Sequence, residues 1–329
     1  MKGINPATGE QKGAATKDPL EWTGYEDMME AYLEQLRFFA DKHNKLIKLG
    51  TQNNKEHMGR PFTSAFADDS LERGLMLEEW AWPYMHYNWL VVGPINAANS
   101  MAAIKKWVFD EKKVKMADLI DALRKNWEGH EDIRQLMLSA PKFGNDDDYV
   151  DLIAAEVQEK STQVMQSFTD LWGIPFAVNG TNAATIFGFS WDTDATPDGR
   201  FKGDMLADGT VSPMLGTDTK GPTAVFRSIA KIDVTKTYSH LLNQKLSPAL
   251  VEGEAGREAF YNYIRAWMEL GISHIQFNVI KKETLVDAQV HPKDHMDLIV
   301  RVAGFSAYYI DLSKGMQDSI IDRTEQGAW

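Results

Sequence analysis

Apolar positions along most of the chain recur with the period of an α-helix. Between residues 26 and 49, Met29, Leu33 and Leu36 are spaced three or four positions apart, which predicts a long amphipathic helix. Asn99 or Ser100 is a suitable cap for a second helix, and acidic residues at 146–148 favour the start of another. Helices are predicted over residues 26–49, 100–110, 116–127, 150–172, 223–232, 253–270 and 314–325.

Three shorter apolar runs have the length and composition of strands. They cover residues 183–189, 241–246 and 272–280, and Gly271 is the expected stop of the helix before the last of them. Strands mixed with long helices predict an α/β domain with helices packed outside a sheet or barrel. Residues 192–223 are rich in turn formers, which indicates either a surface excursion or a functional segment held by its neighbours.

Composition narrows the class of protein. The 329 residues are 43% hydrophobic, enough for one large domain or two small ones. A net charge of -12 argues against nucleic acid or an anionic membrane as a partner, because both reward clustered Lys and Arg. No apolar run reaches the length of a membrane span, and the first residues lack the apolar centre of a signal peptide. We therefore expect a soluble cytoplasmic protein.

The chain contains no cysteine. This excludes disulfides, thiolate metal sites and cysteine-held iron-sulfur clusters from within the chain, and it also excludes a thiyl radical here. His291 and His295 are four residues apart, but Pro292 opposes a helix interior there, so solvated histidines are favoured over a metal site. No metal site is expected.

Gly304 interrupts a run of strand-favouring residues near the C-terminus. A glycine there costs backbone entropy and leaves nothing to pack, so it indicates a bulge or a loop tip, or a chemical need for glycine. One such need is a radical at the α-carbon, which is delocalised over both flanking amides and would be crowded by a β-carbon. The pattern alone leaves these alternatives open.

The residues around Gly304 resemble a known signature. The run from Arg301 to Gln326 is similar to the C-terminal signature of the glycyl radical enzymes, with Gly304 at the radical position. A second block, from residues 196–200 through 207–209 to 221–224, also resembles these enzymes.

The resemblance implies a fold and a division of the chain. Glycyl radical enzymes have a ten-stranded barrel with surrounding helices, and a glycine-bearing loop inside it faces a cysteine-bearing loop. The chain resembles the C-terminal part of this α/β barrel, with residues 1–280 as the barrel portion and 281–329 as the glycyl radical domain. Because the chain is too short to close the barrel, the resemblance implies a partner or a missing N-terminal portion. We expect the cysteine-bearing N-terminal half to come from another chain.

Within the superfamily, the chain most resembles the X-succinate synthases, which add a hydrocarbon C-H across the double bond of fumarate. This resemblance rests on residues 88–93, 98–100, 241–246 and 274–279. Arylacetate decarboxylases and diol or amine eliminases share many of the same blocks and stay open as alternatives. So do a non-catalytic radical spare part and an inactive remnant.

The resemblance also implies a mechanism and its partners. An activating enzyme that cleaves S-adenosylmethionine would install the radical on Gly304, with no cofactor bound by this chain. The radical would pass to a cysteine on the other half and then to a small-molecule substrate. The expected partners are this half, the activating enzyme and small accessory subunits.

A substrate pocket is placed by the same resemblance. It brings the strand carrying Asn182, Ala184 and Ile186 beside the substrate, with Trp89 on another wall. Small Ala184 and apolar Ile186 suit a hydrocarbon better than a polyol, whose hydroxyl groups need buried polar partners. From the residues alone, these side chains are equally consistent with ordinary core packing.

Overall fold

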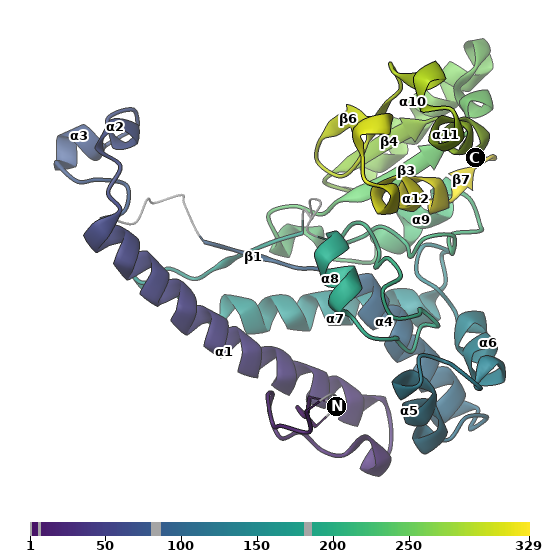
Figure 1. Cartoon of the computed structure of the whole chain (residues 1–329), viewed down its shortest axis with the longest axis horizontal. Helices are drawn as coiled ribbons and strands as arrows, with labels where there is room; N and C mark the ends of the chain where they lie inside the picture. The colour runs from purple at the N-terminus through teal and green to yellow at the C-terminus, as the bar shows by residue number, and fades with distance from the viewer. Residues whose placement is uncertain (1, 6–7, 80–86, 181–185) are drawn as a thin grey trace. The chain divides into compact units, whose positions relative to one another are not determined.

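The computed structural model describes residues 2–5, 8–79, 87–180 and 186–329. The chain forms two compact units. The first unit comprises Met1–Trp22, Glu26–Trp89 and Lys160–Val178, and the second comprises Thr23–Tyr25, Leu90–Glu159 and Asn179–Trp329. Figure 1 shows the elements with their labels. No helix in the described parts of the chain is long and apolar enough to cross a membrane.

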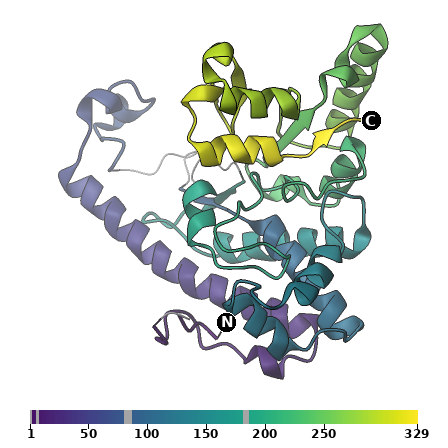
Figure 2. The same ribbon diagram turned by 45° about the vertical axis from the view of Figure 1, so that its right-hand side comes forward.

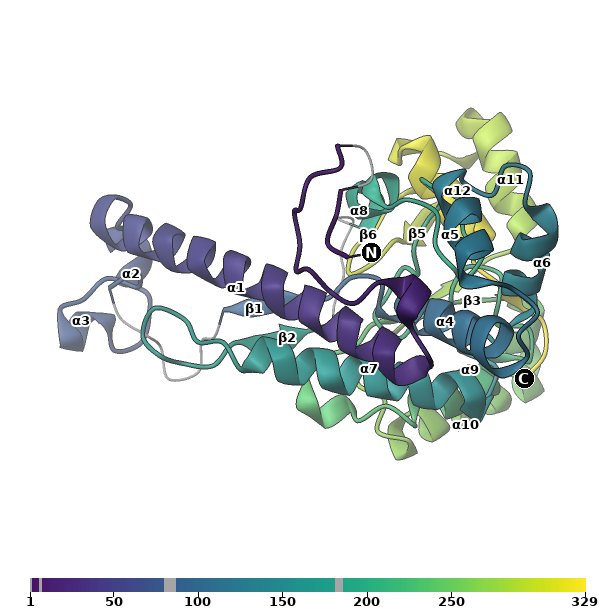
Figure 3. The ribbon, with the colours of Figure 1, turned by 90° about the horizontal axis from the view of Figure 1, so that it is seen from below.

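The first unit is built on the long helix α1 (Tyr25–His57). The predicted helix is confirmed, but it continues beyond residue 49 through a polar sequence of good helix formers. The N-terminal segment folds back along α1 (Figure 3), where the Gln35 side chain donates to Ala14 O at 2.7 Å and accepts from Ala14 N at 3.1 Å. The short helices α2 (Pro61–Ser64) and α3 (Ser70–Arg73) follow α1.

The predicted acidic start of the next long helix is confirmed. Helix α7 covers Asp148–Gln166 and is therefore shorter than the predicted 150–172 at its C-terminal end. Three carboxylates near its start surround one ammonium group: Lys231 Nζ lies 3.0 Å from Asp146, 2.6 Å from Asp148 and 2.9 Å from Asp151. The acidic cluster is therefore partly compensated by the charge of Lys231.

The helix predicted to begin at Asn99 or Ser100 begins earlier. Helix α4 covers Pro94–Ile104 and continues as the π-helical η2 (Lys105–Asp110). Gly93, with φ +72°, ends the preceding segment, and Pro94 supplies the first helical position, where its missing N-H costs nothing. Asn99 is instead buried inside the helix and accepts a hydrogen bond from Phe143 N at 2.9 Å.

A parallel three-stranded sheet lies in the second unit, in the order β4-β3-β7. The strands are β3 (Leu242–Leu246), β4 (Ile275–Val279) and β7 (Glu325–Gln326), and in register Asn243 pairs with Gln276. Helices α9 (Pro222–Ile229) and α10 (Gly253–Glu269) are both close to their predicted bounds, and Gly271 follows α10 with φ +70°. The predicted strands 241–246 and 272–280 are confirmed.

The strand predicted over residues 183–189 is wrong for its described part. Residues Ile186–Asp192 form helix α8, in which Ser190 Oγ donates to Ile186 O at 2.7 Å. A short apolar run has no periodicity that separates a buried strand from a buried helix, so the sequence pattern was ambiguous here. Residues 183–185 lie outside the described residues.

The remaining elements are short. They comprise the strands β1 (Asn88–Leu90) and β2 (Ala177–Asn179), which pair with each other, helices α5 (Met116–Arg124), α6 (Glu131–Ser139), α11 (Lys282–Val290) and α12 (Lys314–Asp322), strands β5 (Ile299–Arg301) and β6 (Ser306–Tyr308), and the 3-10 turns η1 (Pro19–Glu21), η3 (Val234–Lys236), η4 (Pro248–Val251), η5 (Pro292–His295) and η6 (Tyr309–Asp311).

The turn-rich segment after α8 is held by a buried arginine. Arg200 is 1% exposed and donates to the backbone carbonyls of Thr193 at 3.0 Å, Asp194 at 2.6 Å and Asp204 at 2.6 Å. A planar guanidinium presents five N-H donors in a fixed fork, so it can satisfy several carbonyl groups at once. The segment is therefore an ordered part of the second unit, without helix or strand between residues 193 and 221.

Candidate functional site

Gly304 lies at the tip of a β-hairpin. Strands β5 and β6 pair antiparallel, with Arg301 opposite Ser306, and Val302 N donates to Phe305 O at 2.9 Å to close the loop. Gly304 has φ +81°, a conformation that costs other residues free energy because their Cβ crowds the backbone. The loop-tip interpretation of this glycine is therefore confirmed for the backbone, and it is compatible with a radical at the same atom.

The α-carbon of Gly304 is open. The residue is exposed, and a β-carbon added there would meet no atom of the described residues within 4 Å. Local packing does not account for the glycine. The positive φ is the one reason for a glycine here that the described residues show.

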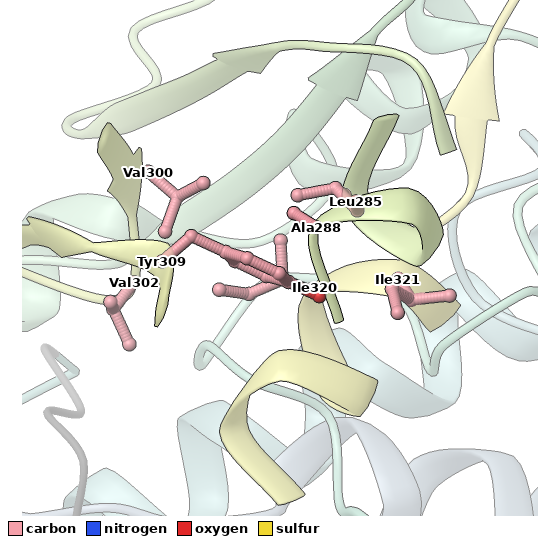
Figure 4. Packing of buried hydrophobic residues seen from close by; sticks show 7 residues of the cluster. All are labelled: Leu285, Ala288, Val300, Val302, Tyr309, Ile320 and Ile321. Atoms are coloured by element: carbon pink, nitrogen blue, oxygen red, sulfur yellow. The ribbon is translucent and has the colours of Figure 1, made fainter. Parts of the chain in front are cut away.

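A cluster of buried hydrophobic residues packs against the hairpin. Tyr309 and Val300 are buried, and Figure 4 shows their side chains against residues of α11 and α12. Burial raises the pKa of Tyr309 to about 12, so its ring stays neutral inside this core. The cluster consists of Leu285, Ala288, Val300, Val302, Tyr309, Ile320 and Ile321. The predicted boundary between a barrel portion (1–280) and a glycyl radical domain (281–329) stays a prediction. All residues of this cluster lie after residue 280.

A buried arginine fixes the base of the hairpin. Arg323, directly after α12, forms an ion pair with Asp208, and each side chain is 6% exposed. Its guanidinium also donates to Arg301 O at 3.1 Å and Val302 O at 2.5 Å. The end of the chain, drawn in yellow in Figure 2, is thereby tied to the hairpin and to the turn-rich segment. Removing one partner of such a pair would leave an uncompensated buried charge.

A buried lysine stabilises the C-terminal end of α12. Lys245 on β3 is 1% exposed, and its Nζ donates to Ile321 O at 2.8 Å. Burial lowers the pKa of Lys245 to about 8. A cation at this position satisfies carbonyl groups that have no partner within the helix.

Side chains of β4 contact the hairpin directly. Gln276 Oε1 accepts from Gly304 N at 3.1 Å and from Arg301 Nε at 2.5 Å. Two residues along the strand, Asn278 donates to Arg301 O at 2.7 Å and accepts from Arg301 N at 2.8 Å. Alternate residues of a strand share one face, so this face of β4 holds both the tip and the base of the hairpin.

The predicted pocket residues are divided between the two units and the part of the chain that the structure does not describe. Trp89, on β1 in the first unit, is 9% exposed and packs on Phe176 and His43, with ring centroids 5.2 and 4.9 Å apart. Ile186 begins α8 in the second unit and is 2% exposed. Asn182 and Ala184 lie outside the described residues. A substrate role for these four residues stays a prediction.

A groove of about 640 Å³ lies in the first unit, beside Arg37, Phe38 and Phe168. Trp89 does not line it. Within the described ranges, no cluster of His, Asp and Glu side chains is arranged to hold a metal ion. His291 and His295 instead contact the same carboxylate, Asp287, at 2.9 and 2.7 Å.

Two known protein families match this chain. Residues 1–185 match the family described as pyruvate formate lyase-like, and residues 207–310, which include Gly304, match the family described as glycine radical. The chain belongs to the glycyl radical enzymes. The α/β fold predicted as the C-terminal part of this barrel is confirmed, whereas membership of the X-succinate synthases is not.

The similar enzymes include dehydratases, sulfite-lyases and an indoleacetate decarboxylase. The trans-4-hydroxy-L-proline dehydratase of Clostridioides difficile is 38% identical over 98% of this chain and 41% of the enzyme. The isethionate sulfite-lyase of Desulfovibrio desulfuricans is 36% identical over 96% of this chain and 39% of the enzyme. The glycerol-bound B12-independent glycerol dehydratase of Clostridium butyricum superposes with a TM-score of 0.95 at 35% identity, over 99% of this chain and 41% of that one. This glycyl radical enzyme chain thus spans about two fifths of the length of these relatives.

Gly304 can be identified from the sequence, but the side chains that hold its loop cannot. Gln276, Arg323 and Asp208 are distant from Gly304 in sequence, and only folding brings them to the hairpin. Their one sequence signal was that all three lie within stretches that resemble glycyl radical enzymes.

A buried carboxyl group that contacts the last residues of the chain predicts a pH dependence of stability. Asp218 accepts hydrogen bonds from Thr324 and from Gln326 Nε2 at 2.6 Å, and burial raises the pKa of this carboxyl to about 6. The folded state therefore binds this proton more tightly than the unfolded state. Its contribution to stability is present at low pH and is lost as the pH rises through about 6.

We expect Asp218→Asn to remove this dependence. The amide side chain of the variant is neutral at every pH. Between pH 4 and pH 7, the free energy of unfolding of the unmodified chain should therefore fall by roughly 2–3 kcal/mol relative to that of the variant. Urea unfolding of both proteins across this range measures the difference. Parallel stability curves would show that this carboxyl group does not titrate as its burial predicts.

Proposed function

We propose that this chain is the radical-bearing portion of a glycyl radical eliminase, and that Gly304 carries the radical. The observation that supports this most directly is the hairpin tip: a glycine with an open α-carbon, within the segment that matches the glycine radical family. Its hairpin rests on a rigid core and a buried ion pair, which suits an atom that must meet a reaction partner at a fixed position.

The proposed reaction is the loss of a leaving group from the carbon next to a substrate radical. Two relatives that align with nearly the whole chain are named a dehydratase and a sulfite-lyase, and they support elimination over the addition of a hydrocarbon to fumarate. Ala184, on which part of the hydrocarbon preference rested, lies outside the described residues, and Ile186 is buried. We therefore favour a small polar substrate with a hydroxyl or sulfonate leaving group.

The relay needs a thiol that this chain does not contain. We propose that a cysteine-bearing partner supplies it, and that an activating enzyme that cleaves S-adenosylmethionine installs the radical. Gly304 would take a hydrogen atom from the thiol, and the thiyl would take one from the substrate. After the leaving group departs, the thiol would return a hydrogen atom to the product radical.

The variant Gly304→Ala tests the position of the radical. After anoxic activation, the unmodified chain should show the doublet of a glycyl radical in its electron paramagnetic resonance spectrum, and the variant should show none. The α-carbon of alanine carries a methyl group, which crowds the planar radical and changes the splitting.

Gly271→Ala is the matched control. Gly271 has φ +70°, and like Gly304 it has no described atom within 4 Å of an added β-carbon. Both variants should therefore lose a similar stability, about 1–2 kcal/mol, while only Gly304→Ala loses the signal. A doublet that survives in Gly304→Ala would place the radical elsewhere.

Turnover with alternative substrates tests the reaction class. The activated chain, combined with its cysteine-bearing partner, is given trans-4-hydroxy-L-proline, isethionate, glycerol, or toluene with fumarate. We expect loss of water or sulfite from one of the first three, and no reaction from the chain without the partner. A succinate adduct of toluene would contradict elimination, and a persistent radical without any product would favour the spare-part alternative.

A further inference from the structure

Gln276 is the side chain in direct contact with the backbone amide of Gly304. It lies in the middle of β4, is 5% exposed, and accepts the Gly304 N-H at 3.1 Å. No described atom lies within 4 Å of a β-carbon added at Gly304, so no packing contact replaces a side chain at this residue. The hydrogen bond to Gln276 is therefore a direct restraint on the orientation of this amide.

The direction of the Gln276 amide is itself fixed by three partners. Its oxygen accepts from Arg301 Nε at 2.5 Å as well as from Gly304, and its Nε2 lies 3.3 Å from His274 Nε2. A neutral imidazole can accept a hydrogen bond from this amide nitrogen. Burial and the nearby charge of Arg301 lower the pKa of His274, which keeps the ring neutral at pH 7. Reversing the amide would face its NH₂ group toward two donors, so the oxygen is held toward Gly304.

We propose that Gln276 is a positioning residue that stabilises the radical of Gly304. This inference rests on the proposed function and goes beyond it, because it assigns the control of the radical to a residue on a different strand. Gln276 would act through the Gly304 amide, without touching the substrate.

The physical reason lies in how such a radical is delocalised. The unpaired electron on the α-carbon is shared with the nitrogen on one side, which donates electron density, and with the carbonyl group on the other, which withdraws it. A hydrogen bond from the N-H to an acceptor increases the electron density on nitrogen and so strengthens the donating side. The same bond holds the amide plane against rotation, and delocalisation requires the two planes to stay aligned.

Three substitutions distinguish the effect of the hydrogen-bond acceptor from the effect of side-chain volume. Gln276→Leu keeps most of the volume and removes the acceptor. Gln276→Asn keeps the amide, but its side chain is one methylene group shorter, so the amide lies farther from Gly304. Gln276→Glu keeps both the length and an acceptor oxygen facing Gly304.

The experiment follows the doublet amplitude over time under anoxic conditions in the activated chain with its cysteine-bearing partner. Losing one hydrogen bond should make the radical decay about 3- to 10-fold faster in the Leu and Asn variants, while the Glu variant decays at the rate of the unmodified protein. The α-hydrogen splitting should also change in the Leu and Asn variants, which a purely structural effect elsewhere would not cause.

Gln244→Leu is the matched control. Gln244 is a buried glutamine on the adjacent strand, 3% exposed, whose oxygen accepts from Tyr263 instead of Gly304. This variant should lose stability without changing the decay or the splitting. If Gln276→Leu does not fold, the comparison of Asn with Glu decides.

Decay rates and splittings that are unchanged in both the Leu and Asn variants, or in whichever of them folds, would overturn the role of Gln276 while leaving the radical at Gly304 in place. A change of equal size in Gln244→Leu would also overturn it. If the unmodified, activated chain shows no doublet, the proposed function fails first and this inference fails with it.

Discussion

The buried ion pair between Arg323 and Asp208 is the interaction on which the candidate site depends. A glycine with an open α-carbon has no side chain to hold it in place, so its position must be set by the backbone on either side. Arg323 provides this by binding the carbonyl groups of Arg301 and Val302 while its charge is balanced by Asp208. The cost of burying two charges is offset by this set of hydrogen bonds, because each of the two terminal guanidinium nitrogens donates to a carbonyl group.

The three levels of the site follow from this constraint. The apolar cluster under the hairpin gives a rigid platform, the arginine fixes the base of the loop, and the side chains of β4 orient its tip. Each level uses a different interaction, so the backbone of Gly304 can be held while its α-carbon stays free of contacts. An atom that exchanges hydrogen with a partner group needs this combination of fixed position and open surface.

Much of the fold could be predicted because its signals are local. Helix α1 and the stop at Gly271 follow from periodicity and from the conformational freedom of glycine. Helix α8 could not be predicted, since an apolar run of this length fits two structures equally well. Gly304 was identified because the residues around it resemble the glycyl radical signature. Gln276 was not, because its role depends on a contact between residues that are 28 positions apart.

Fumarate addition also rested on short stretches of resemblance, whereas similarity over nearly the whole chain favours eliminases.

The central claim is that the unpaired electron resides on Gly304. Oxygen cleaves the chain of a glycyl radical enzyme where the radical is, so the most direct measurement is the mass of the fragments after air reaches the activated protein. We predict one cut, at Gly304, which appears only after activation and is absent from Gly304→Ala. A cut at another residue, or an activated chain that stays intact in air, would contradict it.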